Sequence, residues 1–280
     1  MPGVRERKPL NLILKAVLVF LSLFFFLFPL YWMFTMAFKP EIDWTAFPAK
    51  LIPNPWTLDN FYTGLFQMGG LGGTIDSTII AVSNTAISIL LGTLAGYALS
   101  RFRFRRNPAF FILSQRIAPP ITFVIPFFLL FSVVLPFHLL DTYSAVIIVH
   151  LTFNLPFATW MMKTFFDGVP KELDESAMVD GCTPLRAFLR IILPVSLAGI
   201  IATAVMCFMF SWNEFLIQLF LTRSAIKPLP TLIPKFYGGH DILYGVVCAV
   251  SLFAVIPPIL IVAFLQKYLV RGLTMGYLKG

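Results

Sequence analysis

The sequence predicts an all-α membrane protein with six transmembrane helices and both termini in the cytoplasm. Of its 280 residues, 58% are hydrophobic and only 12% are charged, and the mean hydropathy is +0.85. Soluble globular domains carry about 25% charged residues, and a soluble core could not bury so many Phe, Leu and Ile side chains. Six apolar stretches predict the number of spans, and the distribution of Lys and Arg predicts their orientation.

Each apolar stretch exceeds the ~20 residues that a helix needs to cross about 30 Å of hydrocarbon. None alternates with a period of two, which excludes the strands of a membrane barrel. The first is too long for a signal-peptide core and lacks a small-residue cleavage site before Lys39, so it is expected to be retained. The whole chain, 1–280, is thus one membrane domain, with predicted spans at about residues 12–36, 75–99, 108–135, 144–166, 191–221 and 244–268.

Lys and Arg gather on one side of this domain. That side holds 15 of the 21, in the N-terminal segment, the 101–107 loop, the 163–190 loop and the C-terminal tail. The positive-inside rule therefore places both termini in the cytoplasm. The net charge of +8 is thus explained by the orientation of the chain in the membrane, and no nucleic-acid partner is expected. The opposite side carries Lys39, Lys50, Arg223, Lys227 and Lys235.

Two long outer segments are broken by Pro and Gly. Residues 37–74 contain KPEIDW and MGGLGG, and one short interfacial helix is expected there at WTLDNFYTGLF. Residues 222–243 contain KPLPTLIPKFYGGHD, which excludes a span-length helix. The three cysteines have no C-x-x-C spacing, so neither a disulfide framework nor a metal site is predicted.

An acidic segment, ELDESAMVDGCTPLRAFLRIILP, begins at residue 172 in the loop between the fourth and fifth spans. It holds four of the chain's 13 acids, Glu172, Asp174, Glu175 and Asp180. Pro170 suits a first helical position and Gly181 suits a helix end, so a helix is predicted over 170–180. At roughly 16 Å it is too short to span, and it would present its acids to the cytoplasm beside a small apolar face of Leu173, Ala177 and Met178.

A second helix is expected to begin at 184, with Thr183 as its N-cap and Pro184 in its first turn. It would continue into the fifth span, and Pro194 should bend it at the membrane surface. A solvated connector is the alternative interpretation of this loop. A connector needs only about two to eight residues, and lipid headgroups would favour Lys and Arg rather than acids. A protein groove is therefore the favoured partner.

The segment ESAMVDGCTPLRAFLRIILP resembles the EAA loop of binding-protein-dependent ABC importers. That loop reads E-A-A-x-x-D-G, then about nine residues, then I-x-L-P; Ser176 replaces the usual central Ala. Four further segments are similar to carbohydrate-class permeases of the maltose-transporter type. They are LGTLAGYALSR at 91–101, LPFATWMMK at 155–163, SWNEF at 211–215 and VRGLTMGYLKG at 270–280. The resemblance implies the fold of a type I ABC importer permease.

The resemblance also implies a function. The chain would be a permease subunit of an ATP-driven importer for a sugar or sugar-like polyol, in a bacterial or archaeal inner membrane. Expected partners are a second permease in a heterodimer, two cytoplasmic ATPase subunits, an extracytoplasmic solute-binding protein and the lipid bilayer. The chain has no Gly-Lys dipeptide and hence no Walker A loop. It is thus expected to be non-catalytic and to bind no cofactor, with ATP and Mg²⁺ held by the ATPase.

The resemblance further implies that the 167–190 loop is a coupling loop that would dock in a groove of the ATPase. Glu175 would pair with a basic residue there, and Gly181 would allow the turn. The coupling residues implied are Glu172, Glu175, Ala177, Met178, Asp180 and Gly181.

Polar residues within the predicted spans are candidates for the solute pathway. For Asn84 an interhelical hydrogen bond is the favoured role. His150 either packs against a neighbour or contacts solute, and Arg116 either snorkels or pairs with a neighbouring helix. Glu214 is expected to lie far from Arg116 in depth. Near the outer mouth, Asn213 and Glu214 either line a cavity or brace the fold. The pathway candidates are Arg116, His150, Asn154, Asn213, Glu214 and Gln218.

The Pro119–Pro120 pair frees backbone carbonyls, which suggests that the third span faces a cavity. An ATP-independent secondary transporter or channel is the alternative function, but it should show inverted repeats, and none is evident. A membrane enzyme is disfavoured because H-E-x-x-H and G-x-S-x-G are absent. The residues suit trehalose, maltodextrin, glycerol derivatives and polyols alike.

Overall fold

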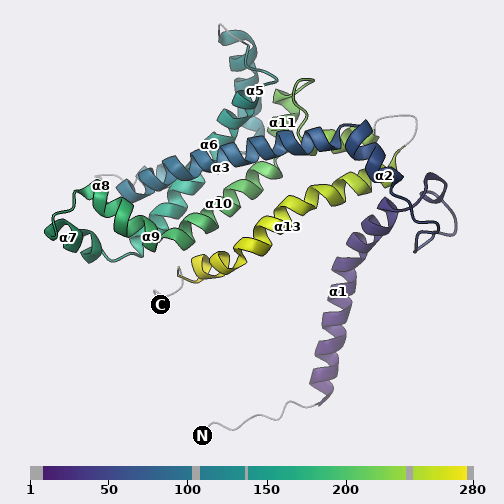
Figure 1. Cartoon of the computed structure of the whole chain (residues 1–280), viewed down its shortest axis with the longest axis horizontal. Coiled ribbons are helices and arrows are strands. Elements are labelled where there is room, and N and C mark those ends of the chain that lie inside the picture. Colours follow the sequence, from purple (N-terminus) through teal and green to yellow (C-terminus); the bar gives the residue numbers. More distant parts are fainter. Residues whose placement is uncertain (1–8, 103–107, 136–137, 238–241, 276–280) are drawn as a thin grey trace. The chain divides into compact units, whose positions relative to one another are not determined.

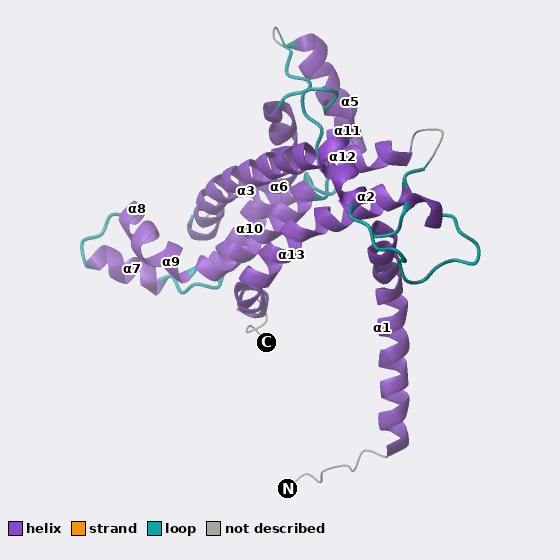
Figure 2. Cartoon of the chain, turned by 45° about the vertical axis from the view of Figure 1, so that its right-hand side comes forward, coloured by secondary structure: helices purple, strands orange, loops and turns teal. Residues whose placement is uncertain are grey.

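The computed structural model describes residues 9–102, 108–135, 138–237 and 242–275. In these ranges the chain is built from helices and loops without a strand (Figure 2), which confirms the all-α prediction. It divides into two compact units, one formed by the chain up to Gly69 with Ile233–Phe253, the other by Gly70–Leu232 with the chain from Ala254 onward. The cations before residue 9, the arginines within 103–107 and the end of the tail lie outside the described residues.

Three helices form the centre of the second unit. α3 (Gly70–Arg101), α6 (Tyr143–Asp167) and α10 (Leu197–Trp212) lie side by side (Figure 1). Glycine allows the close approach of α3 to α6, because a Cβ atom on Gly96 would lie only 2.8 Å from the backbone nitrogen of Lys163. Small residues at four-residue spacing commonly bring membrane helices together in this way.

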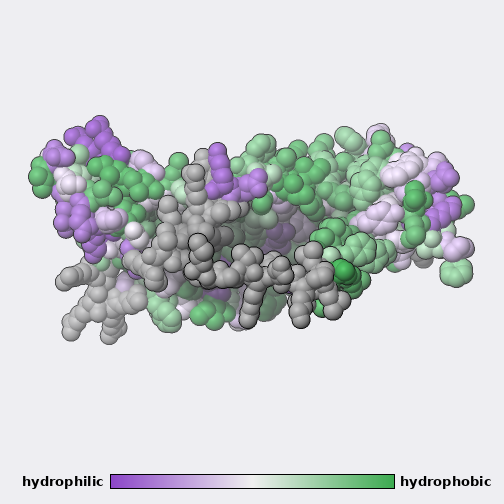
Figure 3. Space-filling view, turned by 90° about the horizontal axis from the view of Figure 1, so that it is seen from below, coloured by the Kyte–Doolittle hydropathy of each residue, from purple (hydrophilic) through white to green (hydrophobic). Residues whose placement is uncertain are grey.

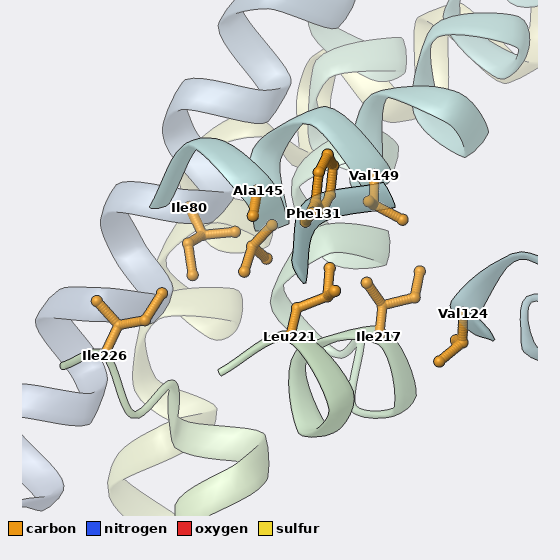
Figure 4. Packing of buried hydrophobic residues seen from close by; sticks show 9 residues of the cluster. Ile80, Val124, Phe131, Ala145, Val149, Ile217, Leu221 and Ile226 are labelled. Atoms are coloured by element: carbon orange, nitrogen blue, oxygen red, sulfur yellow. The ribbon is translucent and has the colours of Figure 1, made fainter. Parts of the chain in front are cut away.

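A buried apolar cluster joins α3 and α6 to two short helices, α5 (Ile121–Leu129) and α11 (Leu216–Leu221). Figure 4 shows its side chains pointing toward one another from separate segments of the chain. The cluster comprises Ile80, Val124, Phe131, Ala145, Val146, Val149, Ile217, Leu221 and Ile226. Burial of this surface holds the short helices against α3 and α6.

The predicted third span is broken. Residues Pro108–Ser114 form α4, and the next helix, α5, begins at Ile121 and continues as a π-helical turn over Leu130–Val134. Pro119 and Pro120 lie in the gap, and because they lack backbone N–H groups they remove two of the hydrogen bonds that would join α4 to α5. The predicted span at 108–135 is therefore made of separate helical segments, and its crossing of the membrane stays a prediction.

The predicted fifth span is bent at its start and ends early. The segment Pro184–Val195, which contains α8 (Pro184–Ala187) and α9 (Leu193–Val195), meets α10 at an angle of 75°. The bend follows Pro194, as predicted. The helix stops at Trp212 rather than 221, and at its end Asn213 Nδ2 donates to the Met209 carbonyl at 2.8 Å.

Four helices of the described chain are long and apolar enough to cross a membrane, and the bent pair would make a fifth. They are α1 (Pro9–Ala37), α3, α6 and α13 (Tyr244–Met275). α3 begins at Gly70 instead of 75, so part of MGGLGG is helical, and Gly69 before it has φ +84°. Six spans and cytoplasmic termini stay predictions.

The first unit contains the expected short helix, as α2 (Asp59–Tyr62) followed by a π-helical turn over Thr63–Gln67. Asn60 Nδ2 donates to the carbonyls of Ala37 at 2.9 Å and Lys39 at 2.8 Å, which fixes the end of α1.

The Lys39 side chain is buried. Lys39 is only 1% exposed, with its Nζ 4.2 Å from the Trp32 ring centroid. Burial lowers the pKa of Lys39 below its ordinary value, although Asp43 opposes this. The segment over 222–243, after α11, holds only α12 (Leu229–Leu232) and a 3-10 turn, Ile233–Tyr237, in its described part.

Candidate coupling helix and solute pocket

The acidic segment forms α7 (Glu172–Val179), followed by a sharp elbow. The helix starts at Glu172 rather than Pro170, which places three acids in its first turn, where the helix dipole favours negative charge. Gly181 has φ +85°, a conformation that glycine adopts without strain. Thr183 Oγ1 accepts the Arg186 N–H at 3.3 Å at the start of α8. The predicted order of helix, glycine elbow and capped second helix is confirmed.

One side of α7 is packed against its own chain and the other is exposed. Ala177 is 2% exposed, and Leu173 packs on an apolar cluster that includes Phe166 and Phe188. Met178 is 44% exposed and Val179 87%. The small apolar face expected from Leu173, Ala177 and Met178 is therefore divided between the two sides, and Ala177 is not available to a partner.

The exposed side carries most of the predicted coupling residues. Figure 3 shows hydrophilic residues, in purple, gathered at the end of the second unit that holds α7 and α8. The predicted residues on this surface are Glu172, Glu175, Met178, Asp180 and Gly181. Val179 belongs to the same surface and was missed.

Asp174 has its basic partner within the chain. Its Oδ2 accepts from Arg101 Nε at 2.7 Å and its Oδ1 accepts from the Tyr97 hydroxyl at 2.7 Å. The side chains of Arg101 and Asp174 are 9% and 10% exposed. Arg101 also donates to the carbonyls of Phe166 at 3.0 Å and Val169 at 3.2 Å. It thus ties the end of α3 to the end of α6 and to α7.

On sequence alone, Arg101 is one of several predicted cytoplasmic cations, and Asp174 is not among the predicted site residues. The available signal was the four-residue spacing of Tyr97 and Arg101 in LGTLAGYALSR, which places both on one face of a helix end.

A second candidate site is a pocket of about 220 Å³ in the second unit. It is lined by α6, α10 and the segments that follow α4 and α10. Four of the six predicted pathway residues line it: Arg116, His150, Asn154 and Glu214. The expected separation of Arg116 and Glu214 in depth is wrong. The break after α4 and the early end of α10 bring both to this pocket.

Arg116 is held between aromatic rings at the pocket. Its guanidinium carbon lies 4.0 Å from the Phe210 ring centroid and 4.7 Å from that of Phe157. Nη1 donates to the Phe153 carbonyl at 3.4 Å. Cation–π contacts of this kind stabilise a desolvated guanidinium. Arg116 therefore pairs with neighbouring helices, which was the alternative to solute contact, and still lines the pocket.

Glu214 both braces the fold and faces the pocket. Its oxygens accept the backbone N–H groups of Ile217 at 2.9 Å and Gln218 at 3.1 Å, which caps the start of α11. Its Oε2 lies 3.5 Å from His150 Nε2. His150 Nδ1 in turn lies 2.7 Å from Ser211 Oγ. These side chains form a connected polar wall.

Asn154 joins three helices beside the pocket. Its Nδ2 donates to Asn84 Oδ1 at 2.6 Å and to the Cys207 carbonyl at 3.1 Å. The interhelical role predicted for Asn84 is confirmed. The two other candidates do not line this pocket. Asn213 is exposed and bonded to its own helix, and Gln218 is 1% exposed, with Nε2 3.4 Å from the Ser211 carbonyl.

Comparison with known proteins shows the family to which the chain belongs. Residues 88–275 match the family described as "Binding-protein-dependent transport system inner membrane component". The chain is 37% identical over 259 residues to a probable ABC transporter permease, y4oR, of Sinorhizobium fredii, covering 91% of each chain. It is 35% identical over 272 residues to the trehalose transport system permease SugB of Mycobacterium tuberculosis, covering 95% of this chain and 97% of that protein.

A solved structure has the same fold. It is a bacterial ABC transporter involved in the import of the acidic polysaccharide alginate, with a TM-score of 0.79, 22% identity, and coverage of 96% of this chain and 99% of that one. The expected type I importer permease fold is thus confirmed, and the channel and enzyme alternatives are set aside. The chain belongs to the family of inner membrane components of binding-protein-dependent transport systems, as a multi-pass, non-catalytic permease subunit of an ABC importer.

Proposed function

We propose that this chain forms half of the pathway of an ATP-driven importer for a sugar or sugar-like polyol, and that α7 couples it to a cytoplasmic ATPase. The observation that carries the proposal is the two-sided construction of α7. Leu173, Asp174 and Ala177 bind it to its own chain, whereas Glu175 and Met178 face outward. A helix anchored on one side, with acids and an apolar side chain on the other, suits docking into a basic, partly apolar groove.

The proposed partners follow from the family. They are a second permease that completes the pathway, two ATPase subunits that hold ATP and Mg²⁺, and an extracytoplasmic solute-binding protein. The family description itself includes dependence on a binding protein.

The substrate class rests on the relatives and on the pocket. SugB is a permease of a trehalose transport system, and the similar solved transporter takes part in the import of a polysaccharide. Aromatic rings beside an amide, a carboxylate and an imidazole suit a ligand rich in hydroxyl groups, since a few polar groups on apolar walls are typical of small-molecule sites. Asn154, His150 and Glu214 would supply these polar contacts.

The geometry provides a route from the ATPase to the pocket. α7 is joined through the Gly181 elbow to α8 and α9, and these lead through the bend at Ser196 into α10. α10 contributes Phe210 and Ser211 to the pocket wall. When ATPase closure displaces α7, we expect α10 to shift and the pocket to change its access.

A photo-crosslinker tests the docking. We replace Met178 with a photoreactive phenylalanine analogue in the full complex, and in a separate variant replace Leu197, which is similarly exposed at 49% but lies beyond the bend. The Met178 position should crosslink to the ATPase subunit, and the Leu197 position should not. No crosslink to the ATPase from the Met178 position, or equal crosslink yields from the two positions, would contradict the assignment of α7 as the docking helix.

A further inference from the structure

We infer that Arg101, Asp174 and Tyr97 form a latch that makes the coupling helix move together with α3. The latch is the set of contacts made by these three side chains. The inference rests on the proposed coupling function of α7. It assigns Arg101 and Asp174 as positioning residues for transport, although neither is expected to touch solute or ATPase.

The latch has the geometry of a rigid connection. Asp174 receives one charge-assisted hydrogen bond from Arg101 and one hydrogen bond from Tyr97, both at 2.7 Å. Charge-assisted bonds are short and directional, and the two charged groups are almost fully withdrawn from solvent. A buried pair of this kind is costly to break on one side, because the remaining charge has no partner.

Arg101, at the end of α3, bonds to three other parts of the chain: α7, the last turn of α6 and the linker between them. Besides Asp174, it holds the Phe166 carbonyl in the last turn of α6 and the Val169 carbonyl in the linker to α7. The Tyr97 ring packs on Phe188, with ring centroids 4.5 Å apart. The end of α3 therefore contacts the segments on both sides of α7 in the sequence.

The remaining anchors of α7 are of another kind. Leu173 belongs to the apolar cluster formed around Phe188 and Ile192, and Ala177 is also buried. Apolar contacts are non-directional and allow one element to slide over another. Asp174 supplies directional bonds from α7 to α3, and these resist such sliding.

α3 in turn reaches the pocket. Gly92 and Gly96 pack against α6 without room for a side chain, and Asn84 accepts a hydrogen bond from Asn154, which lines the pocket. A force on α7 would thus reach the pocket through α3 as well as through α10. Without the latch, only the connections along the chain and the apolar contacts of α7 remain, with α6 before it and with α8, α9 and α10 after it.

The test uses the complete importer in proteoliposomes, with solute uptake and ATP hydrolysis measured together. Asp174→Asn keeps the size of the side chain and removes its charge. Arg101→Gln removes the other partner. Lys163→Gln is the matched control, because Lys163 forms a 2.5 Å ion pair with Asp167 near the same helix ends that is far more exposed, at 26% and 41%.

We expect each latch variant to lower the solute moved per ATP by about tenfold, the size of effect seen for residues within coupling networks. The ATPase should still copurify with the chain. The double variant should be no worse than the poorer single variant, because both changes remove one interaction. Asp174→Glu, which keeps a carboxylate, should recover part of the ratio, and Lys163→Gln should match the unmodified chain.

Two results would overturn the latch. One is an unchanged ratio of solute to ATP in Asp174→Asn within an assembled complex. The other is loss of assembly in both Asp174→Asn and the milder Tyr97→Phe, since these contacts would then serve folding alone. Failure of the proposed function would look different, because a chain with the latch intact and the photoreactive residue in place of Met178 would then give no crosslink to the ATPase.

Discussion

Asp141 organises the loop after α11 through a single carboxylate. Its φ of +63° is a left-handed conformation that few non-glycine residues adopt. Partial burial would by itself raise the pKa of this carboxyl. Backbone hydrogen bonds outweigh that effect and lower the pKa below the ordinary Asp value. The donors are Ala225 at 2.7 Å, Arg223 at 2.8 Å, Ser224 at 2.9 Å and Ile226 at 3.3 Å.

Asp141→Asn should loosen this loop. The amide has one neutral acceptor oxygen in place of two charged ones, so tryptic cleavage after Arg223 should be about tenfold faster, as expected when local opening costs less free energy. Cleavage after Lys235 in the same digest is the internal control and should not change. Equal acceleration at both sites would contradict a local role.

The lowered pKa sets the sign of the pH dependence of this protection. A carboxyl whose pKa is lower in the folded state stabilises that state above the ordinary Asp pKa of about 3.9. This contribution is lost only as the pH falls below that value toward the folded pKa. Protection of the Arg223 bond by Asp141 should therefore be constant from about pH 6 to pH 8.

At the scale of elements, helix ends were predictable where the signals were local. Thr183, Pro184 and Gly181 set the coupling loop through caps and a positive φ, which depend on adjacent residues alone. The shared pocket of Arg116 and Glu214 was not predictable, because it depends on two breaks in long apolar segments and on the packing that follows. Asp174 was missed for the same reason, since its partner Arg101 is distant in the sequence.

The contact of α3 with α6 supplies a test at this scale. A Cβ atom on Gly96 would lie 2.8 Å from the Lys163 nitrogen and 3.0 Å from the Thr159 carbonyl oxygen, and backbone atoms cannot move aside cheaply. Gly96→Leu should lower the melting temperature of the purified chain by roughly 5 °C, since overpacking costs about 1–3 kcal/mol. Gly72→Leu on the same helix meets open space and should leave it unchanged. Equal melting temperatures for the two variants would contradict this packing.

At the scale of the whole molecule, the composition alone predicted a membrane protein, and a short acidic motif predicted its family. The order of helices and the coupling loop followed from sequence because apolar length and caps are local properties. The structure adds what the motif could not show. One acid of the segment is bonded within the chain, and the others remain on the exposed side of α7, where a partner can bind them.

The central claim is that α7 couples this permease to ATP hydrolysis. ATP-dependent uptake by the complete importer in proteoliposomes tests it most directly, with Glu175→Lys compared with Glu41→Lys, the same charge reversal at another exposed acid. Glu175→Lys should abolish uptake, because it repels the basic partner, while the chain remains in the membrane; Glu41→Lys should retain uptake. Uptake at the unmodified rate by Glu175→Lys, or uptake by the purified chain alone without ATP, would contradict the claim.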